Sequence, residues 1–155
     1  MKGSYILLLQ LPQPLVALQI GRLGSYDFAP GYYLYVGSAF GPGGLEARIA
    51  RHRSRSQARP HWHIDYLRPH TRLREIWTVA GPTRFECRWC RALMATPGVS
   101  IPVRGFGSRD TGCPAHLFYL PHAPRPALLT GVILGAVSVR QPAELLIEIH
   151  SYDDE

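Results

Sequence analysis

Apolar residues near the start of the chain fall into three short runs. Residues 5–11 and 15–20 are separated by Pro12 and Pro14, and an aromatic-rich run follows at 31–37. Runs of this length that are bounded by turn residues are typical of strands. The pattern therefore predicts three short strands, paired antiparallel, with the stretch GRLGSYDFAPG as the loop before the third.

The pattern then changes to helical spacing. Leu45 and Ile49 lie four residues apart, and Glu46 stands in the first turn, where a helix favours an acidic side chain. These positions predict a helix over residues 45–52, followed by an Arg-rich loop. The next segment, HWHIDYLR, is a candidate for a second short helix that ends before Pro69.

The rest of the chain mixes strand-like and helix-like segments. LREIWTVAG alternates well enough for a strand, and Pro82 is expected to open a helix that runs to about Met94. Residues 97–114 are rich in Gly and Pro and are expected to form a loop, and AHLFYL is a further strand candidate. Two apolar segments within 127–150 have no predicted type.

These elements predict one α+β domain with a small antiparallel or mixed β-sheet flanked by helices. At 155 residues the chain is long enough for one substantial core and too short for two. Hydrophobic residues make up 46% of the chain and charged residues 18%, which excludes an intrinsically disordered protein. Neither a repeat nor a linker marks a second domain.

Arginine supplies nearly all of the positive charge. The formal net charge is +6, and Lys2 is the only lysine. Because a planar guanidinium binds phosphate through two parallel hydrogen bonds, this composition favours an anionic partner such as nucleic acid. A bias in composition would give the same totals, so the placement of the arginines has to decide.

The sequence carries no sign of secretion or membrane insertion. The apolar run at 5–11 is broken by prolines and has no small-residue cleavage site after it. The run at 127–139 is shorter than the ~20 residues that span a bilayer. We therefore expect a cytoplasmic protein without a membrane partner.

One group of arginines follows a strand that ends in small residues. Arg48 and His52 are four residues apart and share one face of the predicted helix. Taken alone, such a charge run is more often a solvated helix end. It comes soon after Gly37 and Ser38, however, and small side chains at a strand end let a ligand approach the backbone. The strand also carries Tyr35 on the same side as Gly37.

The residues of this region resemble the GIY-YIG nuclease family. The resemblance is carried by GSY at 3–5, YVG at 35–37 and the helix LEARIARH at 45–52. The segment HWHIDYL at 61–67 is similar to that of a small uncharacterised branch of the family, found alone or attached to endonuclease III-type repair proteins. The resemblance covers about residues 3–120. It implies a nuclease domain at 1–122, with residues 123–155 as a C-terminal extension packed on the same domain.

The resemblance also implies a function and a set of site residues. The implied activity is metal-dependent hydrolysis of phosphodiester bonds in DNA, directed by DNA structure or damage, with Mg²⁺ or Mn²⁺ as cofactor. The family's metal-binding glutamate corresponds to Glu86, which we prefer to Glu75 because Glu75 falls in a predicted strand. The implied partners are DNA, more than RNA, and a DNA-repair enzyme.

The resemblance assigns two groups of site residues. The implied catalytic residues are Tyr5, Tyr35, Arg48, His52 and Glu86. The implied substrate-binding residues are Gly37, Ser38, Arg51, Arg53, Arg55, His61, His63 and Asp65.

The chain departs from the family pattern in three places. Ser4 stands where an isoleucine is usual, and about 30 residues separate Tyr5 from Tyr35, which calls for an inserted hairpin or a long loop. The chain also contains no asparagine, although many active relatives carry one near the site. His116 and Asp110 are candidates for its place. The alternative function is therefore a non-catalytic nucleic-acid-binding domain on the same scaffold.

Two further groups of residues suggest metal ligands. His61, His63 and Asp65 alternate, and they would converge on a strand but not on the short helix that we prefer. A zinc phosphoesterase that uses the histidine pairs is a third, more distant function. The pairs Cys87-x-x-Cys90 and Cys113-x-x-His116 have the outline of a zinc site, which would not be catalytic. Buried free cysteines, or a disulfide from Cys113 to Cys87 or Cys90, are the competing interpretations. The terminal YDDE is expected to be a solvated acidic end.

Overall fold

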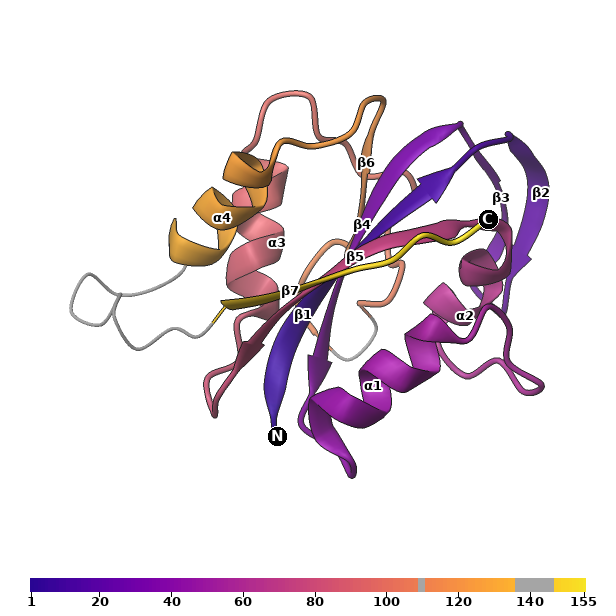
Figure 1. Ribbon diagram of the computed structural model, residues 1–155. Helices are drawn as coiled ribbons and strands as arrows, with labels where there is room; N and C mark the ends of the chain where they lie inside the picture. Colours follow the sequence, from indigo (N-terminus) through magenta and orange to yellow (C-terminus); the bar gives the residue numbers. More distant parts are fainter. Residues whose placement is uncertain (109–110, 136–146) are drawn as a thin grey trace.

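The main sheet has five antiparallel strands in the order β6-β4-β1-β5-β7 (Figure 1). The computed structural model describes residues 1–108, 111–135 and 147–155. The α+β prediction is confirmed, because helices flank this sheet and a second, two-stranded sheet lies beside it. The strands of the main sheet are β1 (Gly3–Leu11), β4 (Gly31–Ala39), β5 (Arg72–Ala80), β6 (Leu117–Leu120) and β7 (Ile147–Ser151).

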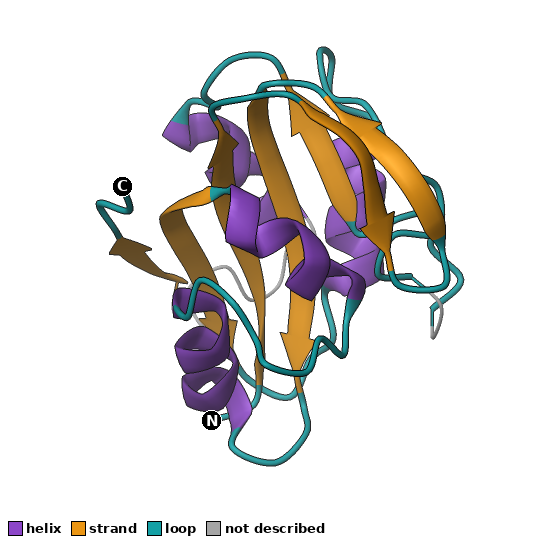
Figure 2. Cartoon of the chain, turned by 90° about the vertical axis from the view of Figure 1, so that its right-hand side faces the viewer, coloured by secondary structure: helices purple, strands orange, loops and turns teal. Residues whose placement is uncertain are grey.

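Helices cover both faces of the main sheet, as Figure 2 shows. Odd-numbered side chains of β1 such as Leu7 enter one core, and even-numbered ones such as Ile6 enter the other. Since both faces are buried, the central strand is an almost continuous apolar run without polar alternation. The first core is closed by α1 (Gly44–Arg53) and α2 (His63–Leu67), and the second by α3 (Glu86–Met94) and α4 (Pro126–Gly135).

A hairpin outside the main sheet fills the interval between the two candidate tyrosines. It consists of β2 (Leu15–Ile20) and β3 (Gly24–Phe28), which pair antiparallel. The sequence predicted β2 but placed β3 in a loop, and this was wrong. β3 has a mostly polar sequence, and its place is secured at one end by Phe28, which is buried in the same core as Ile20.

The third helix begins at Glu86, four residues after the predicted start at Pro82. Phe85 occupies the position before the helix, and its carbonyl accepts the first helical hydrogen bond from Trp89 N at 2.9 Å. The Phe85 ring stacks on the Trp89 ring, with centroids 5.5 Å apart. The Phe85 backbone N–H donates a hydrogen bond to Ser4 Oγ. These contacts fix the start of α3, and they place Glu86 in its first turn.

The acidic C-terminal residues dock on the domain, so the prediction of a solvated end was wrong. Asp154 Oδ2 accepts hydrogen bonds from Arg68 Nη2 at 2.7 Å and from Leu73 N at 3.0 Å. Arg68 belongs to a short 3₁₀ turn (Arg68–His70), and its side chain is only 4% exposed. A guanidinium that is buried to this extent needs a counter-charge, and Asp154 supplies it.

Replacing Asp154 with Asn is expected to lower the free energy of unfolding by about 1–3 kcal/mol at neutral pH. Burial alone would raise the pKa of Asp154, but the hydrogen bonds from Leu73 and Arg68 hold it below its ordinary value. The stabilisation is therefore complete above the ordinary aspartate pKa of 3.8 and is lost as the pH falls through the lower folded-state value. Urea unfolding should show the difference between wild type and variant shrinking at acidic pH. Asp153→Asn, at an exposed neighbour, is the control and should change stability by less than about 0.5 kcal/mol.

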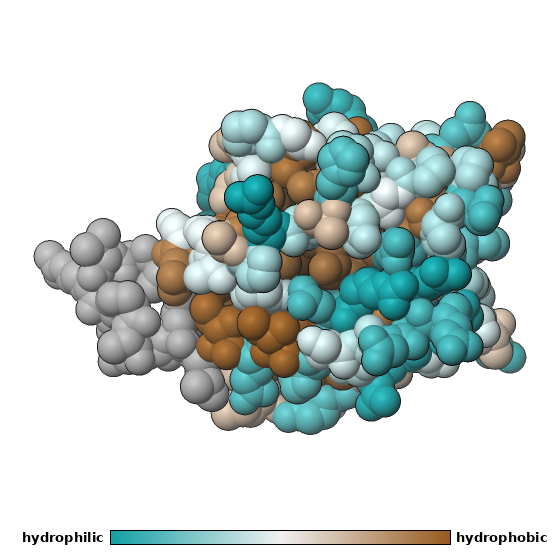
Figure 3. All heavy atoms as spheres, turned by 45° about the horizontal axis from the view of Figure 1, so that its top comes forward, coloured by the Kyte–Doolittle hydropathy of each residue, from teal (hydrophilic) through white to brown (hydrophobic). Residues whose placement is uncertain are grey.

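Apolar and hydrophilic side chains divide one face of the molecule, as Figure 3 shows. Apolar residues gather toward the left of this view, and hydrophilic residues gather toward the right. Leu134 and Ile149 are 43% and 50% exposed. Within residues 1–108, 111–135 and 147–155, no helix has both the length and the apolar character that a membrane crossing requires.

Candidate functional site

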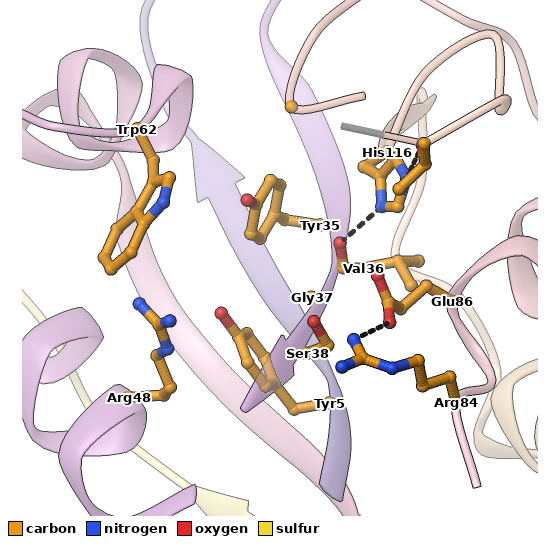
Figure 4. A pocket seen from close by; sticks show the side chains of 12 residues that line it. Tyr5, Tyr35, Val36, Gly37, Ser38, Arg48, Trp62, Arg84, Glu86 and His116 are labelled. Atoms are coloured by element: carbon orange, nitrogen blue, oxygen red, sulfur yellow. Dashed lines mark hydrogen bonds and ion pairs between the residues drawn. The ribbon is translucent and has the colours of Figure 1, made fainter. Parts of the chain in front are cut away.

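A cavity of about 300 Å³ opens at the end of β4 that carries the small residues (Figure 4). Its wall is assembled from distant parts of the chain: two sheet strands, α1, the segment before α2, the start of α3 and the loop that precedes β6. The side chains and backbone that line it belong to Tyr5, Tyr35, Val36, Gly37, Ser38, Arg48, Trp62, Arg84, Glu86, Gly107, Thr111 and His116.

Gly37 makes room for a neighbouring side chain of the protein. It lies directly opposite Tyr5 in the β1–β4 pairing. A Cβ atom at Gly37 would come within 2.4 Å of the Tyr5 Cζ and Oη atoms. The sequence suggested that the small residue lets a ligand approach the strand, whereas the space above Gly37 is occupied by the Tyr5 ring. Gly37 and Ser38 still line the cavity beside that ring.

Gly37→Ala is therefore expected to displace the Tyr5 ring and to lower the free energy of unfolding by about 1–3 kcal/mol. Gly41→Ala is the matched control, because a Cβ there would meet nothing closer than Arg48 Nη2 at 3.7 Å. Its stability should stay within about 0.5 kcal/mol of wild type. Urea unfolding of both variants measures the difference, and equal stabilities would contradict the tight packing at Gly37.

The phenols of Tyr5 and Tyr35 point toward the same part of the cavity. In Figure 4 both hydroxyl groups are directed at Arg48 and Trp62. Burial raises the pKa of Tyr5 well above its ordinary value, with the neighbouring Tyr35 adding to the effect and Arg48 opposing it. Burial also raises the pKa of Tyr35. Both hydroxyls are therefore protonated near neutral pH.

His52 is a buried neutral partner of Tyr5. Its Nε2 atom lies 2.8 Å from Tyr5 Oη, within hydrogen-bond distance. Burial lowers the pKa of His52 to about 3, and the pull of Asp65 in the other direction does not offset it. The resemblance implies a catalytic role for His52. As a neutral imidazole it would take part as a hydrogen-bond partner of Tyr5 and not as a cation.

Trp62 supports Arg48, one of the implied catalytic residues. The Arg48 guanidinium lies over the Trp62 ring at 4.0 Å from its centroid, and Arg51 approaches the same ring at 4.6 Å. Such a stacked guanidinium keeps its polar edge free to bind an anion. Trp62 lies in the cavity wall, and it was not named as a site residue from the sequence.

Asp65 holds Arg51 and the backbone of Trp62 in place through hydrogen bonds. Its Oδ2 atom accepts hydrogen bonds from Arg51 Nη2 at 2.7 Å, from His61 N at 2.8 Å and from Trp62 N at 2.9 Å. Burial would raise the pKa of Asp65, but these hydrogen bonds lower it below its ordinary value. Asp65 and Arg51 were expected to bind substrate. The structure places them outside the cavity wall, where they position Trp62.

The other arginines of this segment lie away from the cavity. Arg53 covers the Tyr152 ring at 5.2 Å, and Arg55 hydrogen-bonds to the backbone carbonyl of Glu155. Both were expected to bind substrate, but they contact the docked C-terminal residues and do not line the cavity. The charge run therefore divides into one cavity residue and several structural ones.

The two histidines before α2 have different surroundings. His61 is exposed, and its ring contacts the Trp62 ring with centroids 4.9 Å apart. His63 Nδ1 accepts a hydrogen bond from Gly107 N at 2.8 Å, and its ring packs on Phe106. His63 therefore positions the loop at 105–108, of which Gly107 lines the cavity, and neither histidine lines it directly.

Glu86 brings the only carboxylate among the cavity-lining residues given above. Its side chain is 12% exposed, and Oε1 lies 3.9 Å from Arg84 Nη1. The competing candidate Glu75 lies on β5, where it accepts a hydrogen bond from Trp77 Nε1, and it does not line the cavity. Arg84 was not a sequence candidate, although its place two residues before Glu86 and beside a helix start was a usable signal.

His116 lines the cavity close to Val36. Its Nδ1 lies 3.0 Å from the Val36 carbonyl oxygen, and its Nε2 lies 2.9 Å from Thr111 Oγ1. The sequence offered His116 and Asp110 for the place of the family asparagine. His116 does border the site, whereas Asp110 lies outside the described residues.

The cysteines are divided between a disulfide and the core. Cys87 and Cys113 are joined by a disulfide, which links the first turn of α3 to the loop before β6. Cys90 is free and buried in the second core, between α3 and the sheet. The four-ligand zinc outline is therefore not formed, because Cys90 lies outside the group that Cys87, Cys113 and His116 form. The structure contains a disulfide from Cys113 to Cys87 and a buried free Cys90.

Comparison with known proteins gives one match. A family model described as a domain of unknown function, DUF123, matches residues 4–133 of the chain. No curated protein and no solved structure is significantly similar. The matched span includes every residue of the cavity wall, and it covers most of the 155 residues. The chain therefore belongs to the DUF123 family.

Proposed function

We propose that this protein is a metal-dependent endonuclease that hydrolyses phosphodiester bonds in DNA, directed by DNA structure or damage. The observation that carries the proposal is the convergence of Tyr5, Tyr35, Arg48 and Glu86 on one cavity from four separate elements. Two phenols, a guanidinium and a carboxylate are the groups that orient water, bind a phosphoryl oxygen and hold a divalent cation. The resemblance to GIY-YIG nucleases supports the same assignment.

Arg48 binds the phosphate in this proposal. Its guanidinium is held over Trp62 before any substrate arrives, so little conformational freedom is lost on binding. Charge develops on the phosphoryl oxygens as the phosphodiester is attacked, and a fixed guanidinium stabilises that charge. Arg84, 65% exposed on the other side of Glu86, is placed to contact the neighbouring DNA backbone.

Tyr5 and His52 form a hydrogen-bonded pair that orients the attacking water. Since the Tyr5 hydroxyl is protonated and His52 is neutral, we propose that the Tyr5 O–H donates a hydrogen bond to His52 Nε2. The lone pairs of the Tyr5 oxygen are then free to accept a hydrogen bond from water in the cavity. Because the pKa of His52 is so low, its protonation contributes no change in activity between about pH 5 and 8.

Glu86 is the residue that fits a divalent cation. Mg²⁺ prefers oxygen ligands and commonly takes one or two carboxylates while keeping several waters, and Glu86 with the nearby Ser38 hydroxyl offers such donors in the cavity. The long ion pair from Arg84, at 3.9 Å, is weak enough to yield to a cation. When bound, Mg²⁺ or Mn²⁺ would stabilise the leaving oxygen of the phosphodiester.

Recognition in this proposal depends on the DNA backbone and its shape. The cavity wall presents arginines, which bind phosphate, and no element has the form of a base-reading module. A cytoplasmic location and cooperation with a DNA-repair enzyme belong to the same proposal.

The test is incubation of the purified protein with end-labelled branched, nicked and single-stranded DNA in the presence of Mg²⁺ or Mn²⁺. The proposal expects metal-dependent cleavage that stops when the metal is chelated. Salt-sensitive binding without cleavage would instead support the non-catalytic nucleic-acid-binding domain. Absence of both cleavage and binding would contradict both functions.

A further inference from the structure

A second group of metal-ligating side chains lies at the edge of the cavity, where it shares only His116 with the cavity wall, and the proposed cleavage assigns it no role. Cys87 Sγ, Cys113 Sγ and one ring nitrogen of His116 all lie within 4.8 Å of one another. In a tetrahedral zinc site, bond lengths of about 2.3 Å to sulfur and 2.0 Å to nitrogen separate the ligand atoms by roughly 3.5–3.8 Å. The distances between the three ligand atoms are therefore close to those that a single zinc ion requires.

We propose that Cys87, Cys113 and His116 bind a zinc ion when the Cys87–Cys113 disulfide is reduced. Two thiolates and an imidazole are soft ligands that select zinc and do not suit Mg²⁺. The site is thus chemically distinct from the one proposed at Glu86. Three protein ligands leave the fourth tetrahedral position to water.

His116 is oriented as a zinc ligand should be. Its Nδ1 lies 3.0 Å from the Val36 carbonyl oxygen, which can only accept a hydrogen bond, so Nδ1 carries the proton. In the neutral ring Nε2 then presents its lone pair, and a carbonyl behind the other nitrogen is the usual support of a metal-bound histidine. Nε2 now contacts Thr111 Oγ1, whose hydroxyl has a second acceptor in the Ser108 carbonyl at 3.3 Å. Thr111 can turn to Ser108 when the metal binds.

The cysteine side of the site is open to solvent. A second hollow, of about 380 Å³, is lined by Cys87 and Cys113 together with Met94 and Pro114. Both cysteines are partly exposed, so a reductant and a metal ion can reach them. Cys90 also borders this hollow but is completely buried in the core and lies outside the ligand cluster.

Reduction and metal binding are separate steps with a simple balance. A dithiol reductant gives two electrons to the disulfide, the S–S bond breaks, and the reductant becomes a disulfide itself. The two cysteines take up two protons as thiols, and these protons are released when the thiolates bind Zn²⁺. In the oxidised protein the sulfurs are bonded to each other and are not available as thiolate ligands. Either state fastens the loop that carries Thr111 and His116 to the start of α3, next to Glu86.

The test is a titration of the full chain with Co²⁺ as a spectroscopic stand-in for zinc, in the absence of DNA and Mg²⁺. The reduced protein should bind about one Co²⁺ per chain, with a thiolate-to-metal charge-transfer band, and Zn²⁺ should displace it and raise Tm. The oxidised protein should show no such band. Cys113→Ser and His116→Gln should each weaken binding at least ~100-fold, and the matched control Cys90→Ala should bind like wild type.

Two results would overturn the proposal. One is a reduced wild-type protein without the thiolate band, and the other is unchanged Co²⁺ affinity in both Cys113→Ser and His116→Gln. The comparison of oxidised with reduced wild type needs no substitution, so it decides the question even where a variant fails to fold. Because the readout is the metal complex itself, the outcome is independent of whether the protein cleaves DNA.

Discussion

Glu86→Gln is expected to lower the rate of DNA cleavage by roughly 10³-fold at saturating Mg²⁺. The substitution keeps the size of the side chain but removes the negative charge that would hold the cation. DNA affinity measured in the presence of a chelator should change little or increase slightly, because a negative charge near the phosphate has been removed. Single-turnover cleavage rates and fluorescence anisotropy measure the two quantities separately.

Glu75→Gln is the matched control for this prediction. Glu75 is a partly buried glutamate on β5 whose partner is Trp77 Nε1, and it lies outside the cavity wall. Its cleavage rate should stay within a few-fold of wild type. Equal rates for wild type and Glu86→Gln would remove the basis for a cation at this carboxylate.

Arg48→Ala is expected to reduce the cleavage rate by about 10²–10³-fold, the usual cost of removing one preorganised group that stabilises transition-state charge. Arg48→Lys should recover part of the rate, because it restores the charge without the planar fork or the stacking on Trp62. The dependence of log Kd on log salt should also become shallower by about one unit in Arg48→Ala, as expected for one lost phosphate contact.

Arg53→Ala provides the comparison on the same helix. Arg53 covers the Tyr152 ring and does not line the cavity. Its cleavage rate and its salt dependence should match wild type. If Arg53→Ala and Arg48→Ala weakened cleavage equally, the arginines would act as a diffuse positive surface, and the cavity would have no special role.

The parts of the fold that follow from local pattern could be predicted from the sequence. The apolar run of β1 and the helical spacing of Leu45 and Ile49 each gave an element close to its observed bounds. β3 was missed because its sequence is polar and its place depends on Phe28 reaching a core built by distant residues. The start of α3 was missed because the contacts of Phe85 with Ser4 and Trp89 come from the tertiary structure.

The site could be predicted only in part, for a similar reason. Tyr5, Tyr35, Arg48 and Glu86 were named from the resemblance to the GIY-YIG family, and the fold brings all four to one cavity. The roles of their neighbours depend on contacts that a linear pattern does not contain. Asp65 and Arg51 have the residue types of a substrate site, yet their hydrogen bonds are made to each other and to the backbone beside Trp62.

The protonation states of the site residues were the hardest feature to predict from the sequence. Nothing in the spacing of Arg48 and His52 indicates that burial lowers the pKa of His52 to about 3. Burial depends on how the sheet, α1 and α2 close over the residue, and no single stretch of sequence records it. The same closure explains why the phenols of Tyr5 and Tyr35 have raised pKa values.

The most direct test of the central claim is a crystal of the protein soaked with Mn²⁺ and examined by anomalous diffraction, together with a short DNA duplex. The claim predicts an anomalous peak within coordination distance of the Glu86 carboxylate, with a DNA phosphate between it and Arg48. A peak only at Cys87, Cys113 and His116, or a phosphate bound elsewhere on the surface, would contradict it.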